Sequence, residues 1–156
     1  MTQLSPHFTL EELYKSHKAD ELKIDNTPTP EIVENLKILA IALELVRSVI
    51  GKPMDISSAY RCQLLNKAVK GSETSAHRYG LAADFTVVGM TPRQICEKLI
   101  AAGVSKDQLI CEDVSQEHPD GKWVHYGISL PVAGKSTMRN QVLTMKAGKY
   151  YTGLIK

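Results

Sequence analysis

Apolar residues recur at steps of three and four over a long segment of the chain, from position 32 to position 50. This spacing places them on one face of an α-helix. Thr29 can cap the start of the helix, Pro30 fits its first turn, and Gly51 can end it. The apolar positions that define this predicted core helix are Ile32, Leu36, Leu39, Leu43, Val46 and Ile50.

Three further helices are predicted, two of them from capping signals. Residues 9–12 (TLEE) have the spacing of a capping box, in which a threonine oxygen and a glutamate satisfy free backbone amides at a helix start. His7 and His17 flank this short helix, and we interpret them as surface or capping histidines. The same signals at 91–94 (TPRQ) start an amphipathic helix that ends at Gly103. A helix is also expected after Arg61, ending near Gly71.

Alternation of apolar and polar positions predicts strands in the remaining segments. Residues 53–60 read as one strand. Residues 108–114 and 122–130 read as two more, joined by a turn at 119–121 (PDG), which predicts an antiparallel hairpin. Alternation then groups the residues of each strand by the face on which they lie. In the strand 122–130, Trp123, His125 and Gly127 share one face. In the strand 108–114, Gln108, Ile110 and Glu112 share one face, and Leu109, Cys111 and Asp113 share the opposite face.

Helices come first along the chain and a mostly antiparallel sheet comes later, which is typical of an α+β fold. At 156 residues the chain is the size of one domain that can bury a core without a metal or disulfides. We therefore expect one domain over 1–156, in which 1–28 is an N-terminal segment and 131–156 a basic extension. That extension has five lysines or arginines and no acid, and we interpret it as a solvated edge strand, with contact to an anionic surface as the alternative.

Composition narrows the function only slightly. The net charge of +2 does not indicate a nucleic-acid partner. Cys62, Cys96 and Cys111 are widely spaced and odd in number, which favours free thiols and a reducing compartment at synthesis. The start of the chain lacks the features of a signal peptide, and the apolar stretch 38–46 is interrupted by Glu44 and too short to span a bilayer. We expect synthesis in the cytoplasm and no stable membrane insertion.

Residues 75–85 (SAHRYGLAADF) place a histidine and an aspartate seven positions apart. Gly80 between them disfavours a continuous helix, so a loop that leads into a strand is the better interpretation. Asp84 would then project from a strand of small and apolar residues. A buried carboxylate is costly unless a positive or hydrogen-bonding group meets it, and the alanines at 82 and 83 leave room for such a partner.

His77, Asp84 and His125 would together supply two imidazoles and a carboxylate. Three protein ligands with a fourth position open are the arrangement of a catalytic zinc site that holds one ion. Glu112 can point toward His125 from the partner strand if the pairing register permits, and it is our candidate for the general base. The alternative from the residues alone is a loop histidine, a strand-end aspartate and a half-buried sheet histidine without a metal.

Residues 75–84 resemble the S-x-H-x-x-G-x-A-x-D motif of the zinc D-alanyl-D-alanine peptidases, a superfamily that includes VanX- and VanY-like enzymes and shares its fold with the hedgehog signalling domain. Residues 123–125 (WVH) are similar to its closing W-x-H, and 58–61 (SAYR) to its S-x-Y-R segment. Residues 139–144 are similar to the tails of single-domain phage lysis peptidases.

The resemblance implies that His77, Asp84 and His125 bind the zinc, and that Arg61 holds a substrate carboxylate or the developing oxyanion. It also implies a role for Ser75 in orienting the substrate or its loop.

Several branches of the superfamily carry the catalytic acid three residues before the last histidine, where this chain has Lys122. The branch with an L-I-x-E motif fits better, since residues 109–112 (LICE) match it and again indicate Glu112. Asp120 and His118 are weaker candidates for the base. Cys62 occupies a position where the superfamily often has serine.

We therefore expect a monomeric zinc metallopeptidase that cleaves an amide bond in peptidoglycan stem peptides, as a phage or prophage endolysin released to the wall by a holin. The bond would be L-alanyl-D-glutamate or a D,D-linkage. The alternatives are a D-alanyl-D-alanine carboxypeptidase, a non-catalytic wall-binding or phage structural module with the same fold, and a signalling domain of the hedgehog kind.

Overall fold

The longest helix, α3, runs from Pro30 to Ile50. The Oγ1 atom of Thr29 accepts a hydrogen bond from the Ile32 amide, and Gly51 ends the helix with a left-handed φ of 74°. Both ends therefore lie where the capping residues of the sequence predict them. The predicted apolar face is also confirmed, because the residues buried along α3 are Leu36, Leu39, Ala40, Leu43, Val46 and Ile50.

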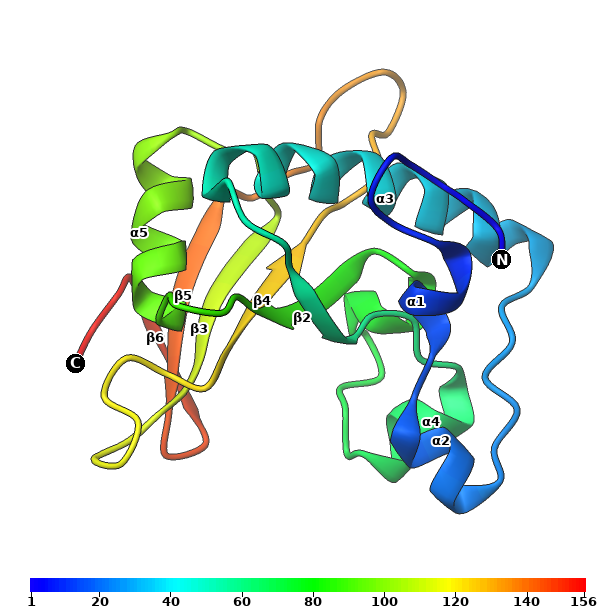
Figure 1. The fold of residues 1–156 in the computed structure, drawn as a ribbon, viewed down its shortest axis with the longest axis horizontal. Helices are drawn as coiled ribbons and strands as arrows, with labels where there is room; N and C mark the ends of the chain where they lie inside the picture. The colour runs from blue at the N-terminus through cyan, green and yellow to red at the C-terminus, as the bar shows by residue number, and fades with distance from the viewer.

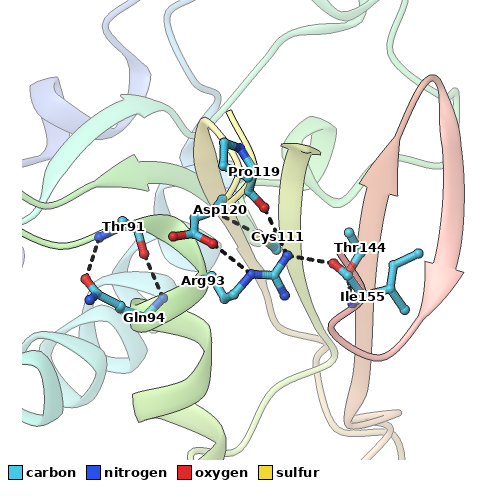
Figure 2. Close-up of polar contacts among 8 residues, drawn as sticks. All are labelled: Thr91, Arg93, Gln94, Cys111, Pro119, Asp120, Thr144 and Ile155. Carbon is cyan, nitrogen blue, oxygen red and sulfur yellow. Dashed lines mark hydrogen bonds and ion pairs between the residues drawn. The ribbon is translucent and has the colours of Figure 1, made fainter. Parts of the chain in front are cut away.

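Helix α5 (Pro92–Ala101) begins with a complete capping box. The Thr91 side chain accepts from the Gln94 amide, and the Gln94 side chain accepts from the Thr91 amide, as Figure 2 shows. Together α3 and α5 cover one face of the sheet (Figure 1).

Three short helices and a 3₁₀ turn complete the helical part: α1 (Leu10–Tyr14), α2 (His17–Leu22), α4 (Gln63–Ala68) and η1 (Ala76–Tyr79). Thr9 caps α1, but Glu12 does not return the bond, so only half of the predicted capping box forms. Helix α2, which begins at His17 and is capped by Ser16, was not predicted from the sequence. His7 caps no helix, and its ring hydrogen-bonds to Glu44 of α3 at the surface.

The computed structural model describes residues 1–156 and contains one six-stranded sheet with the order β1-β2-β4-β3-β5-β6 (Figure 1). The strands are β1 (Asp55–Ser58), β2 (Ala82–Thr86), β3 (Gln108–Val114), β4 (Trp123–Gly127), β5 (Gln141–Lys146) and β6 (Lys149–Thr152). All neighbouring pairs are antiparallel except β3 and β5. The α+β fold with a mostly antiparallel sheet is therefore confirmed.

The predicted hairpin forms from β3 and β4, with Ile110 opposite His125 and Glu112 opposite Trp123. One predicted face is wrong. Asp113 does not share the core face with Cys111, because its φ of 60° bulges the strand and turns Val114 into the core instead. A bulge inserts one unpaired residue, and alternation shifts by one position beyond it.

The sheet separates two environments. Its covered face packs against α3 and α5 and contributes these residues to the core: Ala83, Phe85, Leu109, Cys111, Val124 and Tyr126. The alternate residues of the same strands, among them Asp84, Ile110 and His125, point to the open face. The functional groups therefore lie on the floor of an open face whose reverse side is the hydrophobic core.

The basic C-terminal extension is part of the sheet. β6 is an exposed edge strand, as predicted, but β5 lies inside the sheet between β3 and β6. No helix combines the length and the apolar composition needed to cross a membrane.

Candidate metal centre

Three potential metal ligands converge on the open face of the sheet. His77 comes from η1, Asp84 from β2 and His125 from β4. The Oδ1 atom of Asp84 lies 3.3 Å from His77 Nε2 and 3.0 Å from His125 Nδ1. One ligand atom from each residue lies within 4.8 Å of the other two. Residues from three different elements thus form a cluster with the spacing that one metal ion requires.

The turn that carries His77 depends on its first and last residues. Ser75 caps η1, and its hydroxyl group accepts a hydrogen bond from the His77 amide. Gly80 ends the turn with a φ of 70°, and a Cβ atom there would lie 3.0 Å from a side-chain carbon of Leu36. Only glycine combines the left-handed backbone with the close approach to α3. The chain then enters β2 directly, and this strand presents Asp84 opposite His125.

The ring of His77 is held in one orientation. Its Nδ1 atom lies 2.6 Å from the carbonyl oxygen of Ala59, which fixes the proton on that nitrogen and leaves Nε2 facing Asp84. Burial lowers the pKa of His77, although the nearby Asp84 opposes this. A neutral imidazole with a free Nε2 lone pair is the form that binds a metal.

Asp84 stays ionised in this setting. Burial disfavours its charge, but the neighbouring imidazole groups of His77 and His125 hold its pKa well below its usual range. The cluster therefore offers two imidazole nitrogens and one carboxylate oxygen. This donor set fits zinc, which accepts nitrogen and oxygen ligands in a tetrahedral site and keeps one position open in enzymes.

Gly127 makes room beside the second histidine. A Cβ atom at this position would lie 3.3 Å from His125 Nε2, closer than most side chains tolerate. The missing side chain at Gly127 therefore leaves space next to the ring.

Glu112 lies one strand away from His125 on the same face of the sheet. The residue is buried, with only 6% of its surface exposed. Burial raises the pKa of Glu112 to about 7, and the negative charges of Asp84 and Asp113 add to this while His125 opposes it. A carboxyl group with this pKa can accept and return a proton at neutral pH.

Arg61 stands at the other side of the cluster with an uncommitted guanidinium group. Its Nη2 atom donates only a long bond of 3.4 Å to the hydroxyl oxygen of Ser75, and its buried Nε has no partner. Burial lowers the pKa of Arg61, and Asp84 counteracts this. A buried donor without a partner is costly, so the fork is available for an anionic group of a ligand.

The sequence predicts the helix after Arg61 but assigns no role to Cys62. In the structure the Sγ atom of Cys62 caps α4 by accepting from the Leu65 amide at 3.5 Å. Sulfur therefore takes the part that a serine hydroxyl group plays at many helix starts.

Two weaker candidates for the base lie elsewhere. Asp120 forms an ion pair with Arg93, its Oδ1 atom 3.1 Å from Nε, and Figure 2 shows the same arginine binding the Pro119 and Ile155 carbonyl groups. His118 is exposed in the same loop. Neither residue lines the cleft that holds the metal ligands.

That cleft has a volume of about 730 Å³ and extends on both sides of the cluster. One end is formed by the segment 69–76 with Arg61, the other by β5 and β6. The residues of β5 and β6 that line the cleft, among them Leu143, Met145 and Tyr150, were not predicted as part of the site. Alternation within 141–146 is the signal that could have found them, because Leu143 and Met145 share the face of Gln141.

Comparisons with known proteins identify the family. The Peptidase M15 family model matches residues 6–119, which is most of the chain and includes Arg61, His77, Asp84 and Glu112. The match ends before β4, so the position of His125 rests on the geometry. A comparison with curated proteins gives no match. The chain belongs to the Peptidase M15 family, and it is accordingly a metallopeptidase whose structure presents a His-Asp-His cluster for the metal.

Proposed function

We propose that the protein is a zinc-dependent peptidase that cleaves an amide bond in the stem peptides of peptidoglycan. The observation that carries the proposal is the cluster of His77, Asp84 and His125 on the floor of an open cleft, one strand away from Glu112. Membership of the Peptidase M15 family supports the reaction class.

The metal would be held by His77 Nε2, Asp84 Oδ1 and His125 Nδ1, the three atoms that face one another. Zinc bound there would supply a Lewis acid that polarises a carbonyl group and makes water more acidic. The hydrogen bond from His77 Nδ1 to the Ala59 carbonyl group orients one ligand from behind, as is usual for histidines that bind metals.

Glu112 acts as the general base and then as the general acid. Its carboxylate takes a proton from the attacking water and returns it to the amine that leaves when the C–N bond breaks. A pKa of about 7 suits both steps, because the group loses and gains its proton near neutral pH. The apolar surroundings that raise the pKa thus serve the chemistry.

Arg61 binds the negative charge of the substrate. Its Nε and remaining Nη hydrogens have no acceptor in the protein, and it stands across the metal ligands from Glu112. A substrate carboxylate or the oxyanion that develops during attack would satisfy them. Ser75, which contacts both Arg61 and the His77 amide, positions these two residues relative to each other.

The cleft favours an internal bond of a longer peptide. It runs past the cluster in both directions, so residues on each side of the cleaved bond find a surface. We further propose that the protein works as a monomer in phage or prophage lysis and reaches the wall through a holin. The sequence similarity of residues 139–144 to phage lysis peptidases supports this role.

Mass spectrometry of purified peptidoglycan after digestion by the zinc-loaded protein tests the proposal. New internal stem-peptide termini are expected, and their identity assigns the L-alanyl-D-glutamate or the D,D-bond. The Glu112→Gln protein is the matched control and should leave the wall intact. Release of terminal D-alanine alone would assign a carboxypeptidase, whereas wall binding without new termini would assign a non-catalytic module and refute the proposal.

The lysis role needs a test of its own. Co-expression of the protein with a phage holin should lyse bacterial cells, whereas the protein or the holin alone should lyse them far more slowly. Equal lysis with and without the holin would refute the holin-dependent route but not the peptidase activity.

A further inference from the structure

The floor of the cleft continues beyond Glu112 onto the last two strands. In the sheet order, β2 and β4 carry the metal ligands, β3 carries Glu112, and β5 and β6 follow. β5 contributes Leu143 and Met145 to the cleft, and β6 contributes Tyr150. We call these three residues the hairpin shelf. They lie outside the part of the chain that matches the Peptidase M15 model.

Tyr150 is the most prominent group of the shelf. It pairs with Met145 across the hairpin, lines the cleft and is 59% exposed. Burial of part of the ring raises the pKa of Tyr150, and the negative charges of Glu112 and Asp84 raise it further. These charges act on the phenol only because the ring lies near the functional groups.

The next residue, Tyr151, points the other way. It pairs with Thr144, a fully buried residue of the covered face, and it does not line the cleft. Tyr151 is 40% exposed. The hairpin thus provides two adjacent tyrosines, one toward the cleft and one away from it.

The chemistry of the cleavage assigns a part of the substrate to this shelf. Glu112 returns its proton to the leaving amine, so the substrate residue that carries this amine must lie on the Glu112 side of the metal. Arg61 and Lys70 line the opposite end of the cleft. The sheet order then places the leaving residue over β5 and β6.

The shelf offers no free cation to an acidic side chain. Lys146 points to the other face and donates to the Lys156 carbonyl group. Arg139 lines the cleft near β5, but both oxygens of Asp107 already bind its guanidinium group at 3.0 and 2.8 Å. The shelf itself consists of a half-buried leucine, a half-buried methionine and an exposed tyrosine, which is a surface that binds apolar groups.

We propose that the hairpin shelf of Leu143, Met145 and Tyr150 binds the substrate residue that supplies the leaving amine, and that it selects an uncharged side chain there. This inference rests on the proposed peptidase function and makes Tyr150 a specificity-determining residue.

Binding to the Glu112→Gln protein, loaded with zinc, tests the shelf without turnover. The probes are two N-acetylated stem-peptide fragments that differ only in the leaving residue, D-alanine in one and D-glutamate in the other. The chain has a single tryptophan, Trp123, and it lines the cleft, so its fluorescence reports binding directly. Tyr150→Ala, Tyr150→Lys and the matched control Tyr151→Ala are made in the same background.

The D-alanine fragment should bind more tightly than the D-glutamate fragment. Tyr150→Ala should weaken its binding by about tenfold, the size expected for one aromatic contact, while Tyr151→Ala leaves it within about twofold. Tyr150→Lys should shift the preference toward D-glutamate, because it places a cation on the shelf. In proteins that retain Glu112, Tyr150→Ala should raise KM on purified muropeptides and change kcat little.

Two results would overturn the inference while the peptidase function stands. One is equal binding and equal KM for the Tyr150→Ala and Tyr151→Ala proteins, with wall cleavage by the parent protein intact. The other is tighter binding of the D-glutamate fragment by the Glu112→Gln protein. If neither fragment binds and the zinc-loaded parent leaves peptidoglycan uncut, the proposed function itself fails, and the shelf with it.

Discussion

Val124 and His125 are neighbours in β4, yet they belong to opposite faces of the sheet with opposite properties. Val124 is fully buried against the helices, whereas His125 faces the cleft beside Asp84. On the covered face Val124 belongs to the apolar core, so its burial lowers the free energy of the folded state. On the open face the metal ligands lie close to Arg61, whose buried Nε has no partner, and stability alone does not favour this arrangement.

This comparison shows how a small fold separates stability from chemistry. The apolar core on one face holds the backbone of the strands, and the backbone then positions the groups on the other face. Substitutions on the open face should therefore affect activity with little loss of stability, and substitutions on the covered face should do the reverse.

The largest effect is expected for His125→Ala. Loss of one of three ligands should abolish zinc binding and peptidase activity, while the core of the covered face keeps the domain folded. Metal analysis after dialysis, together with far-ultraviolet circular dichroism, measures both properties. Loss of the folded signal in this variant would contradict the separation of the two faces.

Glu112→Gln should keep the zinc and lose most of the rate. General base catalysis contributes about 10²- to 10⁴-fold, and glutamine cannot accept the proton. Single-turnover rates on muropeptides and metal content are the readouts. A variant with wild-type kcat would exclude Glu112 as the base.

Phe85→Ala should break the covered face instead. Phe85 follows Asp84 in β2 but is fully buried, and loss of a buried phenylalanine costs about 3–5 kcal/mol. Denaturant unfolding should show this loss, while zinc binding and activity per folded molecule remain at low temperature. A large drop in activity of the folded fraction would mean that the two faces are coupled.

The smallest expected effect concerns the stability of the metal-free protein as a function of pH. The pKa of Glu112 is raised from 4.5 to about 7, so its ionised form destabilises the folded state. The protonated carboxyl group of Glu112 contributes stability to the folded state. This contribution is fully present below the pKa that Glu112 has in the unfolded chain, and it is lost as pH rises through its pKa in the folded protein. Glu112→Gln should therefore be more stable than the parent above about pH 7, by on the order of 1–3 kcal/mol, and equally stable near pH 4.

Thermal unfolding of the two metal-free proteins across this pH range makes the comparison. The stability difference should appear only as pH rises from about 5 to about 8. A difference that is constant over the whole range would show that Glu112 is not the titrating group.

The sequence predicted the elements that local rules determine. Thr29 and Gly51 bound α3, and Thr91 with Gln94 begins α5, because capping depends on residues close together in the chain. Strand alternation grouped Trp123 with His125 on one strand and Ile110 with Glu112 on the other, and the observed pairing brings the two groups to one face. Once the hairpin forms in its single register, this alternation determines which groups meet.

Features that depend on distant contacts escaped prediction. Nothing in the segment 141–152 indicates that β5 lies inside the sheet and pairs in parallel with β3. This pairing joins two strands that are far apart in the chain. The bulge at Asp113, whose carboxylate forms an ion pair with Lys122 of the facing segment, interrupts an alternation that is regular in the sequence. Asp120 remained a candidate base until its contact with Arg93 of α5 was known.

The central claim is that His77, Asp84 and His125 bind one zinc ion. A crystal of the protein grown with zinc, measured on both sides of the zinc absorption edge, tests it most directly. The account predicts one strong anomalous peak between the three side chains, about 2.0–2.2 Å from His77 Nε2, Asp84 Oδ1 and His125 Nδ1. A map without a peak at this position, or with zinc bound only elsewhere on the molecule, would contradict it.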